Sequence, residues 1–193
     1  RTIKKDRYER VQFNKTQENL RSTYYKLDVF SIREYRQLIF IDSDVTVLGN
    51  IKEIFNQGPG FWACRTYSSH NDRLNRSINS GVFVVNKEHM TKEVYSKLIN
   101  ISRRGHSMPD QRTINIYFSD CMRFLKKEFN VEKRMWKSEG LKHVWDNKRI
   151  LHWVANKPWM NAEDHANDEE RTFFEIYPLW WEYYNMEWEE IIG

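Results

Sequence analysis

Glycine is scarce in this 193-residue chain, which contains only seven. These glycines form neither a complete G-x-G-x-x-G turn nor a Walker loop, the two patterns that cradle phosphates on a glycine-rich backbone. The sequence therefore excludes both kinds of phosphate site. A phosphate-bearing ligand would have to be neutralised by side chains or by a bound cation.

Cysteines and long apolar runs are also lacking. The two cysteines, Cys64 and Cys121, are too few for a disulfide framework and do not have the spacing of a zinc finger. No stretch approaches the roughly 18 apolar residues that a membrane-spanning helix requires. We therefore expect a soluble domain with no membrane span in these residues. Its compartment, cytoplasmic or Golgi-lumenal, stays open.

The composition is that of a folded protein whose charges are unevenly distributed. Hydrophobic residues make up 40% of the chain and aromatic residues 15%, so we expect one folded domain over residues 1–193. Residues 160–193 carry a net charge of −9 and the remainder carries +13. The basic part suits a phosphate-bearing ligand or a nucleic acid, although two solvated surfaces would give the same distribution. The acidic end, residues 166–193, is rich in aromatic residues and has a helical pattern.

Short apolar runs alternate with amphipathic segments, a pattern typical of α/β proteins with a mainly parallel central sheet. Strands are expected over residues 37–41, 46–48, 61–64, 81–85 and 149–153. Helices are expected over residues 16–35, 51–55, 87–103 and 107–118, and again after residue 168. A polar loop is expected over residues 65–79.

The clearest chemical signal is Asp42-Ser43-Asp44, directly after the apolar run that ends at Ile41. Alternate side chains of an extended segment project to the same side, so Asp42 and Asp44 can converge on one cation. They also lie just beyond the carboxyl end of a strand, where open α/β sheets bind ligands. Carboxylate oxygens suit Mn²⁺ or Mg²⁺, which would neutralise a phosphate in place of a glycine loop.

Two other interpretations of this segment compete. Asp and Ser at a strand end can simply form a solvated turn. The residues also match several ligand positions of an EF-hand loop, with Glu53 at its twelfth position. However, the sixth position requires glycine and is occupied by Val47, so an extended segment is favoured over an EF-hand.

A second cluster follows about a hundred residues later, around His152. Alternation within the expected strand places His152 on the opposite side from its two apolar neighbours, and Lys157 follows within one loop. A lone histidine in a strand is more often a structural residue, but an imidazole could also complete a metal site with Asp42 and Asp44. Lys157 would then be a point charge for a phosphate.

Two polar clusters lie between these segments. Asn79-Ser80-Gly81 enters a buried strand, where amides and hydroxyls can bind a polar ligand or simply form a loop. Asp110-Gln111 lies at the beginning of a helix. Because Ser107 and Asp110 have capping-box spacing, Asp110 taken alone is more typical of a helix cap than of a catalyst.

In their order along the chain, these segments resemble glycosyltransferase family 8, a family of retaining enzymes that use sugar nucleotides. The matching stretches are TYYKLDVFSIREYRQLIFIDSDVTVLGNIKEIF, NSGVFVVN, DQRTINIYF, ILHWVANKPW and, more weakly, PLWWEYYN. They follow the family's order over roughly residues 23–184. Five segments in order are a far more specific signal than a lone D-x-D pair.

The resemblance implies a Rossmann-like GT-A fold, a UDP-sugar donor and a divalent metal, Mn²⁺ or otherwise Mg²⁺. It assigns Asp42, Asp44 and His152 as metal ligands. It assigns Lys26, Asp110 and Gln111 as catalytic residues. The donor-binding residues that it assigns are Ser43, Asn79, Ser80, Gly81 and Lys157. Asp110 could stabilise the positive charge that develops on the anomeric carbon, or it could attack that carbon as a nucleophile.

The chain departs from the family pattern in three places. The family's glycine three residues after the histidine is Ala155 here, and Arg76 stands where some members have an aspartate. Only 25 residues precede Lys26, whereas family members have further β/α units there. We therefore expect an N-terminally incomplete or shortened glycosyltransferase domain.

Other functions stay open at this point. One alternative is a non-catalytic relative that binds a nucleotide or a carbohydrate. A nucleic-acid partner is not expected, because no nucleic-acid-binding motif is present. The acceptor is not identified; the loop over residues 65–79 and the aromatic segment after Phe173 are candidate acceptor surfaces. Within that segment, Trp180, Trp181 and Trp188 are more typical of packing residues.

Overall fold

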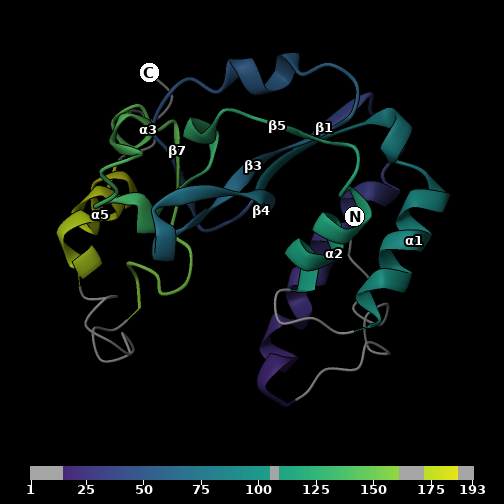
Figure 1. Cartoon of the computed structure of the whole chain (residues 1–193), viewed down its shortest axis with the longest axis horizontal. Coiled ribbons are helices and arrows are strands. Elements are labelled where there is room, and N and C mark those ends of the chain that lie inside the picture. The colour runs from purple at the N-terminus through teal and green to yellow at the C-terminus, as the bar shows by residue number, and fades with distance from the viewer. Residues whose placement is uncertain (1–14, 105–108, 161–171, 187–193) are drawn as a thin grey trace. The chain divides into compact units, whose positions relative to one another are not determined.

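A computed structural model describes residues 15–104, 109–160 and 172–186 (Figure 1). The chain forms two compact units. The first unit comprises Arg1–Ile41, Ile51–Thr66 and Asn75–Lys126, and the second comprises Asp42–Asn50, Tyr67–Leu74 and Lys127–Gly193. The structure has two sheets and two clusters of buried apolar residues, one of each for each unit.

The first unit is built on a four-stranded sheet in the order β1-β4-β3-β5. Its strands are β1 (Gln37–Ile41), β3 (Phe61–Ser68), β4 (Arg73–Asn86) and β5 (Met122–Phe124). The last residues of β3 and the first of β4, within Tyr67–Leu74, belong to the second unit. β1 is antiparallel to β4, with Ile39 opposite Val84, and β3 is parallel to β5. The apolar runs at 37–41, 61–64 and 81–85 thus form strands; most residues of the last two runs are buried, and those of the first are partly buried.

Three helices pack together in the first unit (Figure 1). They are the 3-10 helix η2 (Lys15–Ser31), α1 (Lys92–Ser102) and α2 (Pro109–Tyr117). The buried Tyr24 hydroxyl donates a hydrogen bond to the carbonyl oxygen of Ser102 at 3.1 Å, which joins η2 to the end of α1. Ser107, the expected cap of the helix that contains Asp110, lies outside the described residues.

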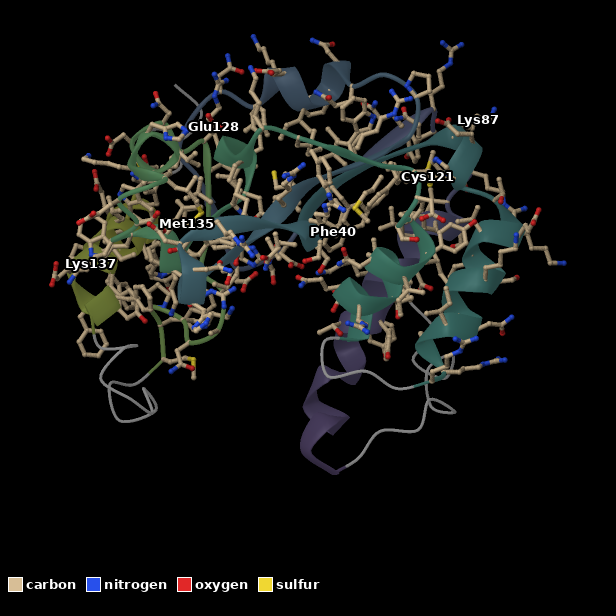
Figure 2. All side chains as sticks on the ribbon, in the orientation of Figure 1. Phe40, Lys87, Cys121, Glu128, Met135 and Lys137 are labelled. Carbon is tan, nitrogen blue, oxygen red and sulfur yellow. The ribbon has the colours of Figure 1, made fainter. Side chains whose placement is uncertain are left out.

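Aromatic rings fill the core of the first unit. The ring centroids of Phe61 and Phe118 are 4.1 Å apart, and Phe30 stacks on Phe83 at 5.9 Å. Phe40, labelled in Figure 2, stacks on Phe83 from β1 at 4.9 Å. Because each ring buries a large apolar area, these contacts hold the helices against the sheet.

The second unit contains a three-stranded sheet in the order β2-β7-β6. Its strands are β2 (Val45–Val47), β6 (Val131–Glu132) and β7 (Ile150–His152). β2 is antiparallel to β7, with Val45 opposite His152, and β6 is parallel to β7. The helices are α3 (Lys142–Asp146) and α5 (Pro178–Tyr184), and the core includes Leu151, Trp153 and Tyr177.

Short 3-10 helices complete the fold. They are η3 (Lys52–Asn56), η4 (Ser69–Asn71), η5 (Lys87–His89), η6 (Lys127–Phe129), η7 (Lys133–Met135) and η9 (Thr172–Ile176). Among the described residues, no helix is both long enough and apolar enough to cross a bilayer.

The α/β class is confirmed, but the expected mainly parallel sheet is wrong, because both sheets are mixed. Two of the strand pairs given above are antiparallel and two are parallel. The expectation assumed that a helix connects each strand to the next. Instead, β3 leads into β4 through the short turn at η4, a connection typical of antiparallel strands.

The expected loop over residues 65–79 is also wrong. β3 continues to Ser68 and β4 begins at Arg73, so most of this segment is extended. The turn between them ends at Asp72, whose φ of 46° lies in the left-handed region that Asp tolerates. The segment looks like a loop in the sequence because Arg73 and Arg76 are exposed polar residues on β4.

Candidate functional site

Asp42, Asp44 and His152 form a cluster in the second unit. One possible ligand atom from each residue lies within 4.8 Å of the others. The Nε2 atom of His152 is 3.2 Å from Oδ1 of Asp44 and 3.9 Å from Oδ2 of Asp42. The two residues of the D-x-D segment thus converge with the histidine, as the sequence predicted.

The pairing of β2 with β7 brings these residues together. Val45 lies opposite His152, and the backbone N–H of Trp153 donates to the carbonyl oxygen of Asp44 at 2.9 Å. The indole N–H of Trp153 also donates to the hydroxyl of Thr46 at 2.8 Å. Because these groups are buried, their hydrogen bonds fix Asp44 and His152 in register.

Asn130 orients His152, a role that the sequence analysis missed. Oδ1 of this fully buried side chain lies 3.0 Å from Nδ1 of His152. An amide oxygen only accepts hydrogen bonds, so Nδ1 of His152 carries a proton, and Nε2 is the ring nitrogen that faces the carboxylates. The only signal in the sequence was a polar residue between Phe129 and Val131, both apolar.

Lys157 contacts the same cluster. Its Nζ donates a hydrogen bond to Oδ2 of Asp44. It donates another, 2.7 Å long, to the carbonyl oxygen of Trp153. Burial alone would raise the pKa of Asp44, but the hydrogen bonds and charges of His152 and Lys157 outweigh it and hold that pKa well below its usual range. Ser43 is exposed and has no hydrogen bond with the described residues.

The cluster fits a divalent metal ion. Two carboxylates and an imidazole Nε2 are oxygen and nitrogen donors of the kind that Mn²⁺ accepts, and the carboxylates also suit Mg²⁺. The EF-hand interpretation is wrong, because Val45–Val47 is a strand and not part of a loop. Glu53, the expected twelfth ligand of that loop, instead pairs with Lys126 at 2.7 Å.

Lys26, Ser80 and Asp110 form a second cluster, which lies in the first unit. Oδ2 of Asp110 is 2.8 Å from Nζ of Lys26 and accepts a hydrogen bond from the Ser80 hydroxyl at 2.7 Å. Nζ of Lys26 also donates to the carbonyl oxygen of Ser80 at 3.2 Å. The long η2, the strand β4 and the start of α2 each contribute one of these side chains.

This second cluster is an ion pair with little exposure to solvent. Asp110 is 7% exposed, and the Lys26 side chain is 8% exposed. Burial alone would raise the pKa of Asp110, but the charge of Lys26 and the hydrogen bonds of Lys26 and Ser80 lower it. Asp110 is therefore an ionised carboxylate at neutral pH rather than only a helix cap.

The remaining predicted donor-binding residues of the first unit lie next to this pair. Ser80 N donates to Oε1 of Gln111 at 3.4 Å, and the amide oxygen of Asn79 accepts from the Gly81 N–H at 2.8 Å. Asn79 and Ser80 are buried. The structure thus brings the predicted residues into two sets, one in each unit. Of the predicted residues, Ser43 alone forms no hydrogen bond or ion pair with the described residues.

The loop after β7 contains an unusual backbone conformation at Ala155. Its φ is 60°, in the left-handed region that favours glycine. This is the position where the sequence departs from the family glycine. The loop is also held by Lys133, whose Nζ donates to the carbonyl oxygen of Asn156 at 2.5 Å.

The aromatic segment at the end of the chain is only partly a packing element. Trp180 is half-buried and lies 4.5 Å from the ring of Trp159, in agreement with a packing role. Trp181 is 42% exposed and Tyr184 is 67% exposed. Trp188 lies outside the described residues.

Comparisons with known proteins agree with this geometry. The family model described as Glycosyl transferase family 8 matches residues 2–163. The putative UDP-glucuronate:xylan alpha-glucuronosyltransferase 4 of Arabidopsis thaliana is 27% identical over 178 residues, which cover 88% of this chain and 30% of that protein. Glycogenin-1 of Homo sapiens is 26% identical over 184 residues, which cover 82% of this chain and 48% of that protein. The chain thus spans half or less of the length of these two relatives.

A solved structure with a similar fold is that of the glycosyltransferase GlyE in Streptococcus pneumoniae TIGR4. Its TM-score is 0.62 at 21% sequence identity, and the match covers 88% of this chain and 45% of that chain. This likeness confirms the GT-A fold class. Since the family model spans most of the residues, the chain belongs to glycosyltransferase family 8.

Proposed function

We propose that this protein transfers a sugar from a UDP-sugar donor to an acceptor, that the reaction requires Mn²⁺ or Mg²⁺, and that it retains the anomeric configuration. The observation that carries the proposal is the convergence of Asp42, Asp44 and His152 next to Lys157. Membership of the family supports sugar transfer. The Arabidopsis relative is named for UDP-glucuronate, which supports a UDP-linked donor.

The first set of residues would act on the leaving group. When a sugar–phosphate bond breaks, negative charge develops on the departing diphosphate, and a bound divalent cation would stabilise that charge. Asp42, Asp44 and His152 would hold the cation, with Asn130 keeping His152 in the required tautomer. Lys157 lies next to Asp44 and would add a positive charge for the diphosphate oxygens.

The second set would act on the donor sugar. An ionised Asp110 can stabilise positive charge on the anomeric carbon or attack it as a nucleophile, and both roles need the carboxylate that Lys26 maintains. The Ser80 hydroxyl and Lys26 both bond Oδ2 and fix the orientation of the carboxylate. Asn79 and Gln111 supply amide groups that can hydrogen-bond sugar hydroxyls.

The test is UDP release by the purified protein from several UDP-sugars, with and without Mn²⁺. Asp44→Asn should lower the Mn²⁺-dependent rate about 100-fold or more, because it removes a charged ligand of the cation. The matched control is Asp146→Asn, which removes an exposed carboxylate of α3 that pairs with Lys142. This control should retain the wild-type rate.

Other outcomes would overturn the proposal. Mn²⁺-dependent UDP binding without turnover would indicate the non-catalytic relative. Salt-sensitive binding of an oligonucleotide, with no affinity for UDP, would indicate a nucleic-acid-binding protein. Inversion of the anomeric configuration, measured by NMR of the product, would contradict the proposed retention but not the proposed sugar transfer.

A further inference from the structure

A cavity of about 560 Å³ in the first unit belongs to neither set of residues described above. We call it the arginine pocket. β3, β4, α2 and β5 all contribute to its wall. Its lining residues are Arg65, Arg76, Ser77, Arg112, Asn115, Ile116, Ser119, Asp120, Met122 and Phe124. The volume is in the usual range for a small-molecule site.

The arginine pocket carries an excess of positive charge. Arg65, Arg76 and Arg112 come from three different elements, and Asp120 is the only acidic residue of the wall. Within residues 15–104, 109–160 and 172–186, none of the three guanidinium groups forms a hydrogen bond or an ion pair. Arg76 and Arg112 are exposed, so their donors are available to an anion.

Part of the wall is apolar and exposed. The guanidinium carbon of Arg65 lies 4.2 Å from the centroid of the Phe124 ring, so the ring holds that cation in place. Phe124 is 37% exposed and Ile116 is 38% exposed. A pocket with apolar walls and a few charged groups is typical of sites for small organic ligands.

The walls that carry the arginines are fixed to one another. Asn115 of α2 accepts a hydrogen bond from the N–H of Ile78 at 2.8 Å and donates one to its carbonyl oxygen at 3.0 Å. These two bonds occupy a backbone edge of β4 and hold α2 against it. Since Arg76 is on β4 and Arg112 on α2, the backbone positions that carry the two arginines are fixed relative to each other before any ligand binds.

The arginine pocket is separate from the Lys26–Asp110 ion pair. Its three α2 residues, Arg112, Asn115 and Ile116, have the spacing of one helix face, and Ser119 follows in the turn after the helix. Asp110 is followed instead by the buried Thr113 and Ile114, which pack on the other side of the helix. The pocket is therefore a second candidate site of the first unit.

We propose that the arginine pocket binds a sugar-sized organic anion whose carboxylate or phosphate group contacts Arg76 and Arg112. Planar guanidinium groups suit both anions because their paired N–H donors match two oxygens at once. Phe124 and Ile116 would contact the carbon skeleton of the ligand. The ligand is either an acidic acceptor or an acidic effector, and the two share this chemistry.

The first experiment measures binding with no UDP-sugar and no Mn²⁺, so its result is independent of the proposed function. Saturation-transfer NMR on the whole chain would compare glucose 6-phosphate and glucuronate with neutral glucose at constant ionic strength. We expect the two anions to bind and glucose not to bind. Arg76→Gln and Arg112→Gln should each weaken binding about tenfold, the effect of losing one hydrogen bond to a charged group.

The matched control is Arg103→Gln, which removes the same charge from an exposed arginine that lies just after α1 and lines no part of the pocket. Equal weakening by Arg103→Gln would indicate general electrostatics and overturn the proposal. Equal binding of glucose and glucose 6-phosphate would also overturn the proposal. Circular dichroism of each variant identifies any loss of folding. Arg76→Lys keeps the charge, so this variant should bind the anions more weakly than wild type but more tightly than Arg76→Gln.

A second measurement distinguishes the two sources of the ligand. With an active donor, an acidic acceptor becomes covalently glycosylated, which mass spectrometry detects as the added mass of one sugar. An effector instead changes the rate of UDP release and is recovered unmodified. If neither anion binds in the first experiment, the proposal is wrong, whether or not the protein releases UDP from a UDP-sugar.

Discussion

At the scale of single residues, the proposed role of His152 as a metal ligand depends on a neighbour that is distant in sequence. His152 can direct Nε2 towards Asp42 and Asp44 only if its other ring nitrogen keeps the proton, and Asn130 supplies the acceptor for it. The D-x-D pair and the histidine could be predicted because their residue types are those of metal ligands. Asn130 could not, because an asparagine has many roles and only the tertiary contact selects one.

Asn130→Leu should weaken Mn²⁺ binding about 10- to 100-fold, because the acceptor for Nδ1 of His152 is lost and the tautomer is no longer fixed. Asn130→Asp keeps an acceptor in the same place and should bind Mn²⁺ more tightly than Asn130→Leu. The measurement is the concentration of free Mn²⁺ by electron paramagnetic resonance. Wild-type affinity in a folded Asn130→Leu protein would contradict the assignment.

At the scale of elements, the strands that contain an apolar run were predicted, including the short β2 and β7, whereas β5 and β6 were not. β1 and the second half of β4 are runs of apolar residues that match the pattern of buried strands. β6 has only two residues, Val131 and Glu132, too few to show a period. It forms because its neighbour β7 supplies parallel hydrogen-bond partners.

The burial of Glu132 is another feature that the sequence pattern does not predict. Its side chain is fully buried, with the Lys127 ammonium 2.9 Å away and the Arg134 guanidinium 2.6 Å away. A sequence pattern that places charged residues at the surface assigns Glu132 to solvent. The ion pairs formed in the tertiary structure, together with a hydrogen bond from the Tyr67 N–H at 2.8 Å, offset the cost of burying its charge.

The loop that follows β7 makes a prediction at this scale. Ala155 has a φ of 60°, which costs an L-residue about 1–2 kcal/mol, and its side chain is exposed. Ala155→Gly should raise the free energy of unfolding by about 0.5–1 kcal/mol, because the strain relieved exceeds the added entropy of the unfolded chain. Urea unfolding measures the difference.

Ala155→Val is the control for this prediction. A β-branched side chain tolerates the left-handed region less well than alanine does, so this variant should be less stable than wild type. A glycine variant that is less stable than wild type would show that the alanine conformation is not strained.

At the scale of the whole molecule, both units contain, among the residues that the structure describes, a buried carboxylate that depends on a cation. Asp110 pairs with Lys26 in the first unit, and Glu132 pairs with Lys127 and Arg134 in the second. Burial raises the pKa of both carboxyls, but the charge of Lys26 lowers the pKa of Asp110 more. The charges of Lys127 and Arg134 likewise hold the pKa of Glu132 below its usual value.

These two carboxyls predict loss of stability in acid. A carboxyl whose pKa is lower in the folded than in the unfolded state contributes stability that is fully present above its unfolded pKa, about 3.9 for Asp and 4.3 for Glu. That contribution is lost as the pH falls through the folded pKa. The free energy of urea unfolding should therefore fall between pH 5 and pH 3.

Glu132→Gln tests which group is responsible. The variant should be less stable at pH 7, because Lys127 and Arg134 lose their partner, and its stability should depend less on pH below 5. A wild-type protein as stable at pH 3 as at pH 7 would contradict the proposed electrostatics of both units.

The sequence by itself determined the family, the α/β class and the residue types of both site clusters. These features depend on local order: an apolar run that ends in Asp42-Ser43-Asp44, and a histidine followed five residues later by Lys157. Only the tertiary structure decided the mixed strand directions, the tautomer set by Asn130, the charge of Asp110 and the wall of the arginine pocket. The physical reason is that hydrogen bonding and Coulomb interactions act over a few ångströms in space, whatever the separation along the chain.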